Sequence, residues 1–345
     1  MKIGFYNYYH VYNNNKMFID QTSPIGDDLC YPFVYLYEYA KNLGIHVSTI
    51  DTEPLESYDA IVFLDFPKKN NIYFKKLIKT NFKNLFLVLC ESEIIRPNNY
   101  DIENHKYFKK IFTWKDSLVN NEQYFKYFLP NKIQVFDTLD IKNKEKLVAL
   151  IAGNKRNSHP KELYSERINA IRWFEKNHPD DFDLYGFDWD EYKFGNKLSL
   201  FNHNKLKFIR KYIKNNYPSY IGFVESKHNT LKKYKFSICY ENAIDIPGYI
   251  TEKIFDCFFS GCVPIYLGSK SIYNLIPENT FVDKRKFGTY EELYSFISQM
   301  SDNEYLTYVK NINDFLNSDK ITPFSAECFA ETFIYQINMG VNTIE

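Results

Sequence analysis

The chain has 345 residues, of which 45% are apolar and 19% aromatic, so it can bury two sizeable cores and exceeds the usual length of one domain. Its 43 basic and 43 acidic residues cancel, and without a net field to attract a polyanion no nucleic-acid partner is expected. Six cysteines without a CxxC pair favour a reducing compartment, and the sequence shows neither a signal-peptide core nor an apolar run of membrane-spanning length.

The first half alternates between predicted strands and helices. A helix is predicted to end at Gly44, and four strands are predicted over residues 2–7, 46–50, 59–65 and 85–90. The last of these is a short, continuously apolar run, which is typical of parallel strands covered on both faces and indicates a doubly wound α/β layer. Residues 109–114 and 132–137 are expected to extend the same sheet.

A second alternation follows a turn, LPNK, and a charged segment, DIKNKEK, which together predict a domain boundary near residue 143. We therefore expect an N-terminal domain over residues 1–143 and a C-terminal domain over residues 144–345. The second domain is predicted to hold strands at 146–153, 182–186, 234–242 and 262–269, a helix at 161–176, a helix after Gly248, and two closing helices at 303–316 and 325–337.

Two common phosphate-binding fingerprints are missing from the sequence. Its twelve glycines form neither GxG nor GxxxxGK[ST], which disfavours a nicotinamide dehydrogenase and a P-loop ATPase. The triplet DWD at residues 188–190 has the form of a DxD metal site, but a solvated turn is the favoured interpretation. Nothing in the sequence requires a metal.

The segment YENAIDIPGYITEKIFDCFFSGCVPIYLGS, residues 240–269, contains a helix with an unusual start. Thr251 is a plausible N-cap and Gly261 a plausible stop, which predicts a buried helix of about nine residues. Glu252 in the first turn agrees with the helix dipole, whereas Lys253 opposes it unless an anion lies nearby. The polar loop before the helix follows a strand, where open α/β sheets bind ligands.

Two explanations of Lys253 are open at this point. Lys253 could pair on the surface with Asp256, three residues further along the helix. Alternatively, a diphosphate could bind at the helix start, facing Lys253 and the backbone N–H groups.

The stretch FSICYENAIDIPGYITEKIFDCFFSGCVPIYLGS resembles the signature of the α-1,3-fucosyltransferases, glycosyltransferase family 10, with about thirty residues matching in order. Weaker similarity runs through LVALIAGNKRN, LYSERINAIRWFEKN and DLYG in the second half and LVLCESEIIRPNNYD in the first. One departure is the loop NAIDIPGY, which is a residue longer than in some bacterial members.

The resemblance implies a GT-B glycosyltransferase, in which two Rossmann-like domains face one another across a cleft. It implies an inverting enzyme whose second domain binds GDP-fucose and whose first domain presents the acceptor. The family's donor-binding residues fall on Asn242, Tyr249, Glu252 and Lys253. Glu252 is then expected to accept from the ribose hydroxyls and Lys253 to neutralise phosphate.

Arg167 lies on the apolar stripe of its predicted helix, where a guanidinium needs a partner. Spacing alone leaves a structural carboxylate and a ligand equally open as that partner. The family places an arginine of this helix at the donor diphosphate, which favours the ligand. The stripe consists of Leu163, Arg167, Ala170, Ile171 and Phe174.

A general base for inversion is sought among the acidic residues after the strand at 85–90. Glu91 follows this strand directly and therefore stands at the carboxyl edge of the first sheet; Glu93 is the rival two residues further on. The family's acidic residue aligns with Glu91. The interpretation of both as solvated loop carboxylates also stays open.

The combined expectation is a fucosyltransferase that moves L-fucose from GDP-fucose to a glycan hydroxyl, namely O3 of N-acetylglucosamine in an N-acetyllactosamine-like or lipid-linked glycan. The alternatives are transfer from another nucleotide sugar and a glycan-binding module without catalysis. No cofactor is required, although some family members are stimulated by manganese. We expect a cytoplasmic location, and peripheral association with a membrane stays open.

Overall fold

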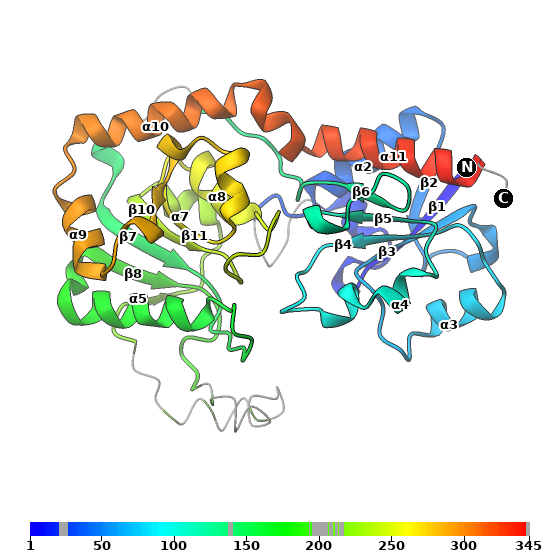
Figure 1. Ribbon diagram of the computed structural model, residues 1–345, viewed down its shortest axis with the longest axis horizontal. Coiled ribbons are helices and arrows are strands. Elements are labelled where there is room, and N and C mark those ends of the chain that lie inside the picture. The colour runs from blue at the N-terminus through cyan, green and yellow to red at the C-terminus, as the bar shows by residue number, and fades with distance from the viewer. Residues whose placement is uncertain are drawn as a thin grey trace. The chain divides into compact units, whose positions relative to one another are not determined.

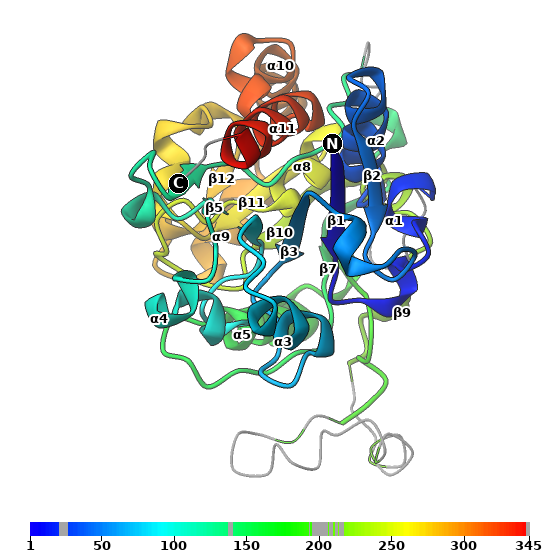
Figure 2. The same ribbon diagram turned by 90° about the vertical axis from the view of Figure 1, so that its right-hand side faces the viewer.

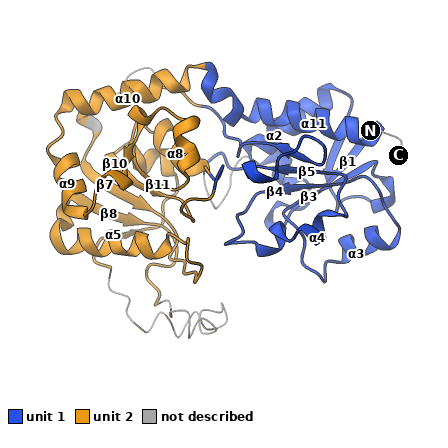
Figure 3. Ribbon diagram, in the orientation of Figure 1, with its two compact units in different colours: residues 1–133, 247–249, 319–345 blue, residues 134–246, 250–318 orange. Residues whose placement is uncertain are grey.

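The computed structural model describes residues 1–20, 27–136, 141–192, 194, 206, 210, 213 and 217–342. The chain forms two compact α/β units, coloured separately in Figure 3. Unit 1 consists of residues 1–133, 247–249 and 319–345, and unit 2 consists of residues 134–246 and 250–318. The units therefore divide at residues 133 and 134, ten positions before the expected boundary at 143.

Unit 1 contains a parallel sheet that, as far as the chain is described, has six strands in the order β2-β1-β3-β4-β5-β6. Every residue of β4 is buried, as its continuously apolar sequence predicted. The strands are β1 (Lys2–Tyr6), β2 (His46–Thr49), β3 (Ala60–Leu64), β4 (Leu85–Leu89), β5 (Lys110–Thr113) and β6 (Tyr124–Lys126).

Helices cover both faces of the unit 1 sheet. Figures 1 and 2 show α2 and α11 on one face and α3 and α4 on the other. The helices are α1 (Lys16–Ile19), α2 (Tyr31–Asn42), α3 (Ile72–Lys79), α4 (Ile102–His105) and α11 (Ala326–Asn342).

The C-terminal helix α11 packs in unit 1, whereas we expected it to close the second domain. The Phe333 ring lies 4.4 Å from the Phe112 ring and 5.8 Å from the Phe5 ring, and Lys110 Nζ donates to Gln336 Oε1 at 2.8 Å. Its apolar stripe thus completes the cover of the first sheet, a pairing between distant parts of the sequence that no local pattern encodes.

The predicted strand at 132–137 is wrong, since residues 132–136 form no strand and the sixth strand is β6. The reason lies in the neighbouring Asn131, whose backbone pairs outside the sheet. Its N–H donates to the Phe324 carbonyl at 2.8 Å and its carbonyl accepts from the Ala326 N–H at 3.0 Å. The chain leaves the sheet here because the segment before α11 takes up these hydrogen bonds.

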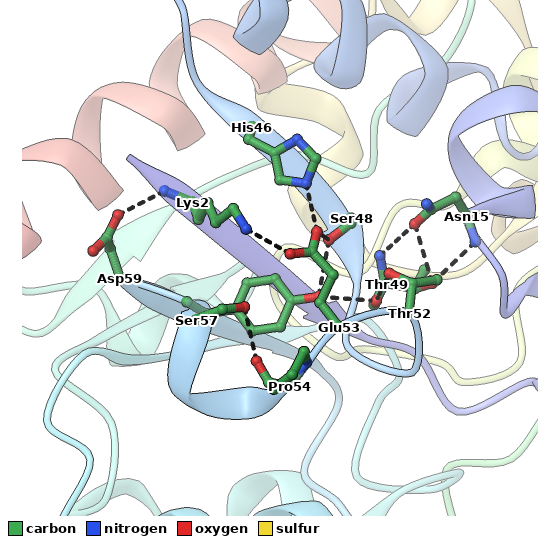
Figure 4. A network of polar contacts seen from close by, with 11 residues as sticks. Lys2, Asn15, His46, Ser48, Thr49, Thr52, Glu53, Pro54, Ser57 and Asp59 are labelled. Atoms are coloured by element: carbon green, nitrogen blue, oxygen red, sulfur yellow. Dashed lines mark hydrogen bonds and ion pairs between the residues drawn. The ribbon is translucent and has the colours of Figure 1, made fainter.

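A polar network lies along the edge strand β2 (Figure 4). Glu53 binds Lys2 Nζ at 2.5 Å and His46 Nε2 at 2.7 Å, and these hydrogen bonds lower the pKa of Glu53 to about 2. Asn15 Oδ1 accepts from the Thr49 N–H at 2.7 Å. The network joins β1 and β2 at the sheet edge and occupies polar groups that an exposed edge would leave unpaired.

Unit 2 holds a second parallel sheet, in which the described residues form six strands in the order β12-β11-β10-β7-β8-β9. This is the strand order of the Rossmann fold. The chain adds β8 and β9 on one side of β7, and then continues with β10, β11 and β12 on the other side, so the order reverses between β7 and β10. The strands are β7 (Lys146–Ile151), β8 (Phe182–Tyr185), β9 (Tyr220–Gly222), β10 (Tyr234–Tyr240), β11 (Val263–Leu267) and β12 (Val282–Asp283).

In unit 2, α5 lies on one face of the sheet and α8 on the other (Figure 1). All five residues of the predicted α5 stripe are buried, Arg167 among them, so that prediction is confirmed. The helices of unit 2 are α5 (Tyr164–Asn177), α7 (Lys227–Leu231), α8 (Glu252–Phe259), α9 (Tyr290–Ser298) and α10 (Asp302–Leu316).

The DWD triplet forms a turn, as expected, but the turn is anchored rather than solvated throughout. Trp189 is buried, and its Nε1 donates to the Ala152 carbonyl at 2.6 Å. Asp188 has a φ of 64°, which fits a turn and not a strand or helix.

We expect Gly186→Ala to destabilise the protein more than Gly222→Ala does, by about 1–3 kcal/mol, the cost of overpacking. Both glycines have positive φ, 125° and 140°, so both substitutions strain the backbone. Only at Gly186 does an added Cβ collide, 2.0 Å from the Ala152 carbonyl oxygen, whereas nothing lies within 4 Å at Gly222. Urea unfolding of the two variants measures the difference in the free energy of unfolding. Equal decreases would show that the backbone around Gly186 and Ala152 shifts to accommodate the added Cβ without cost.

Candidate active site

The predicted donor residues of unit 2 gather beyond the carboxyl end of β10, next to the point where the strand order reverses. The loop from β10 to α8 is held by its backbone: the Leu163 N–H donates to the Asn242 carbonyl at 3.1 Å, and the Ile244 N–H donates to the Lys161 carbonyl at 2.8 Å. Arg285 Nη2 binds Asp245 Oδ1 at 3.0 Å. The loop is therefore fixed on both sides in the place where doubly wound sheets bind ligands.

Arg167 and Asn242, two of the predicted donor-binding residues, lie in contact with one another. Arg167 is 5% exposed, and its Nη2 donates to the Tyr240 carbonyl at 2.6 Å and to Asn242 Oδ1 at 3.1 Å. The guanidinium thus ties α5 to the end of β10 and orients the Asn242 amide toward itself.

Lys253 lies against a buried acid that the sequence interpretation did not include. Its Nζ donates to Thr251 Oγ1 at 2.8 Å and to Glu241 Oε2 at 3.3 Å, and Glu241 is fully buried. The surface pair of Lys253 with Asp256 is wrong, because Asp256 instead binds Lys227 Nζ at 2.8 Å. An anion near Lys253 was expected, and among the described residues Lys253 Nζ faces two carboxylates, Glu241 at 3.3 Å and Glu252 at 3.5 Å.

Thr251 is the N-cap residue of α8, as predicted, but its side chain does not cap the helix. The hydroxyl donates to Glu241 Oε2 at 2.7 Å, and the Thr251 N–H donates to Glu241 Oε1 at 2.8 Å. The buried carboxylate therefore holds the helix start in place, and the Thr251 side chain leaves the first N–H groups of α8 to other acceptors.

Glu252, the first residue of α8, is ionised over the whole neutral range. Burial raises its pKa, but the charges of Lys253 and Lys227 outweigh burial and hold the pKa of Glu252 at about 2. Lys227 responds in the opposite sense: burial lowers its pKa, and the carboxylates of Asp256 and Glu252 raise it above the ordinary value. The helix start thus combines a carboxylate acceptor with ammonium donors, which suits a ligand that carries both hydroxyl and phosphate groups.

Tyr249 is buried and belongs to unit 1, together with Pro247 and Gly248. Its ring lies 4.8 Å from the Trp114 ring. Gly248 is required here, because its φ is 82° and a Cβ would stand 2.2 Å from the Trp114 carbonyl oxygen.

Glu91 lies at the carboxyl edge of the unit 1 sheet, two residues after β4, as predicted. Its N–H donates to Asp65 Oδ1 at 3.1 Å, and its carbonyl accepts from Tyr100 Oη at 3.1 Å. The rival Glu93 forms an ion pair with Lys115 Nζ at 2.9 Å. The backbone of Glu91 is thus held from both sides, whereas the Glu93 carboxylate is engaged by a lysine.

Asp65 positions the Glu91 segment and was missed by sequence reasoning. Its Oδ1 accepts from the Cys90 N–H and from Asn99 Nδ2, both at 2.7 Å, in addition to the Glu91 N–H. Burial raises the pKa of Asp65, against the lowering effect of these hydrogen bonds. The sequence signal that could have identified Asp65 was its position as an acidic residue at the end of a predicted strand. For Glu241 the signal was its position as the acidic residue of the YEN motif.

The described part of the chain lacks both a metal-binding cluster and a membrane-spanning helix. No group of three or more His, Cys, Asp or Glu side chains in it is arranged to hold a metal ion. No helix in it is long and apolar enough to cross a bilayer.

Two doubly wound parallel sheets with polar residues at their carboxyl edges define a GT-B type glycosyltransferase fold, as expected. An α1,3-fucosyltransferase solved with GDP-fucose aligns with a TM-score of 0.55 at 16% identity, over 100% of this chain and 91% of that chain. A DNA-modifying β-glucosyltransferase aligns with a TM-score of 0.52 at 13% identity, over 98% of this chain and 100% of that chain. At such identities the likeness concerns the fold alone, and it does not distinguish between donors.

The resemblance to glycosyltransferase family 10 is confirmed over part of the second half of the chain. Residues 200–324 match the model of "Glycosyltransferase family 10 (fucosyltransferase) C-term". The α-(1,4)-fucosyltransferase of Arabidopsis thaliana is 35% identical over 75 residues, which are 22% of this chain and 18% of that protein. The α-(1,3)-fucosyltransferase FucT of Helicobacter pylori is 38% identical over 77 residues, which are 22% of this chain and 16% of that protein. These matches therefore span less than a fifth of either relative.

Proposed function

We propose that the chain is an inverting fucosyltransferase that transfers L-fucose from GDP-fucose to a glycan hydroxyl, with O3 of N-acetylglucosamine as the acceptor group. One observation carries the proposal. The segment that matches the family 10 model contains Asn242, Glu252 and Lys253, and these residues lie beyond the carboxyl end of β10, beside the reversal of strand order. The relatives named above are an α-(1,4)-fucosyltransferase and an α-(1,3)-fucosyltransferase. Their names support a sugar hydroxyl such as O3 as the acceptor group.

In the proposed reaction, the start of α8 receives the GDP diphosphate. Lys253 and the first N–H groups of the helix stabilise the charge that develops on the departing GDP. Arg167 contributes a guanidinium from α5, Asn242 adds a further donor contact within unit 2, and the ionised Glu252 accepts hydrogen bonds from the ribose hydroxyls.

Glu91 is the proposed general base. Inversion requires the acceptor hydroxyl to attack C1 of fucose from the face opposite GDP, and a carboxylate takes up the proton that this hydroxyl loses. The backbone clamp formed by Asp65, Asn99 and Tyr100 supports the assignment, because a base must be held in a defined place. The proposal requires no metal, and transfer is expected to persist in EDTA.

The test is a donor and acceptor screen that follows nucleotide release. The purified chain is incubated with GDP-fucose, GDP-mannose or UDP-glucose, each with and without N-acetyllactosamine. We expect GDP release from GDP-fucose that depends on the acceptor, and a product with an α-linked fucose on O3 by NMR. Release from another donor would assign another sugar, and glycan binding without release from any donor would indicate a binding module.

A further inference from the structure

In unit 1 the strand order reverses between β1 and β3. The chain continues from β1 to β2 on one side and returns to β3 on the other, so the connections diverge beyond the carboxyl ends of β1 and β3. Tyr8 follows β1 and Lys68 follows β3, whereas Arg96 follows the next strand, β4. The fold therefore brings one aromatic side chain and two cationic side chains to the same edge of the sheet.

Arg96 and Lys68 both contact the same tyrosine. The guanidinium carbon of Arg96 lies 3.4 Å from the centre of the Tyr8 ring, and Lys68 Nζ lies 5.4 Å from it. In the part of the chain that the structure describes, neither cation forms an ion pair with a carboxylate. A guanidinium placed over an aromatic ring can still donate N–H groups from its edge, and their planar arrangement matches a carboxylate or the oxygens of a phosphate.

The electrostatics of the neighbouring tyrosines agree with a positive site. A hydrogen bond to Lys68 and the charge of Arg96 lower the pKa of Tyr8, against the effect of burial. Burial and the charge of Glu91 raise the pKa of Tyr9, which places Tyr9 within electrostatic reach of the proposed base. Tyr9 is 49% exposed and meets the Tyr8 ring edge-on at 5.5 Å, so it offers an apolar face for a sugar ring beside the cations.

A simpler explanation is that Arg96 only offsets the buried charge of Asp65. That carboxylate is already held by the Cys90 and Glu91 N–H groups and by Asn99, and these hydrogen bonds lower its pKa more than the Arg96 charge does. Lys68 is exposed and contacts Tyr8 rather than Asp65. Offsetting Asp65 therefore accounts for neither the stacking of Arg96 nor the position of Lys68.

We propose that Tyr8, Lys68 and Arg96 form a subsite for an anionic group, a carboxylate or a phosphate, on the acceptor glycan. The inference rests on the proposed fucosyl transfer, since it specifies the acceptor of that reaction. It adds that the acceptor carries a negative charge close to the hydroxyl that receives fucose.

The test uses binding, so that it does not depend on transfer. Calorimetry in the presence of GDP compares three probes: N-acetyllactosamine, N-acetyllactosamine bearing a glucuronic acid, and N-acetyllactosamine 1-phosphate. We expect the chain to bind at least one charged probe more tightly than the neutral probe, and the probe that gains affinity distinguishes carboxylate from phosphate. Arg96→Gln is expected to remove this preference, by roughly 10-fold or more, while neutral binding stays within about 2-fold.

Matched variants separate the subsite from a structural role. Lys69 is the exposed neighbour of Lys68, and among the described residues the cations recorded over the Tyr8 ring are Lys68 and Arg96. Lys69→Gln should therefore leave the preference intact, whereas Lys68→Gln reduces it by roughly 2- to 5-fold. Arg96→Lys should retain part of it. Equal loss for neutral and charged probes in Arg96→Gln, or no charge preference in the unaltered chain, would overturn the subsite. A chain that shows the preference but releases no GDP from GDP-fucose would overturn the proposed function and leave the subsite standing.

Discussion

Glu91→Gln is expected to lower fucose transfer by roughly 100-fold or more while the affinity for GDP-fucose stays nearly unchanged. Glutamine keeps the size of the side chain and removes its ability to accept a proton. The backbone of residue 91 is held by Asp65 and Tyr100 through main-chain atoms, so the substitution leaves those hydrogen bonds in place. Single-turnover kinetics, with donor affinity measured separately by calorimetry, provides both values.

Glu93→Gln is the matched control, two residues away on the same segment. Its carboxylate pairs with Lys115, so this variant should lose some stability and little turnover. A fall in turnover that follows Glu93 instead would move the base by two residues. Turnover unchanged in both folded variants would show that the proton leaves by another route.

Lys253→Met is expected to weaken GDP binding by roughly 10- to 150-fold, equivalent to about 1.5–3 kcal/mol, the range for hydrogen bonds to charged groups. Methionine preserves the aliphatic stem and removes the charge proposed to face the diphosphate. The substitution also deprives the buried Glu241 of a cation at 3.3 Å, so a lower melting temperature accompanies it. Calorimetry well below that temperature separates the two effects.

Lys253→Arg keeps the charge and should retain most of the GDP affinity. On helix α5, Arg167→Ala should weaken GDP binding, whereas Arg172→Ala should not, because Arg172 pairs with Glu175 at 2.7 Å. Wild-type GDP affinity in both Lys253→Met and Arg167→Ala would show that the diphosphate does not bind at the start of α8.

Local sequence patterns predicted much of the candidate site. The apolar stripe of α5 placed Arg167 inside, and the end of the apolar strand β4 placed Glu91 at the sheet edge. The partner of Lys253 was not predictable from helix spacing, because Glu241 lies on another element and is brought to it by the fold. Asp65 escaped notice for the same reason, since its partners lie 25 to 34 positions away in the sequence.

The sequence by itself determined the two doubly wound layers, because buried parallel strands require continuous apolar runs and helices carry their start and stop signals locally. It also determined the segment in which most of the proposed donor-binding residues lie. Only the tertiary structure decided that α11 returns to cover the first sheet, that residues 132–136 leave that sheet, and that Asp256 pairs with Lys227. Each of these depends on partners far apart in the chain, and hydrogen-bonding capacity or apolar area becomes a specific contact only when the fold brings those partners together.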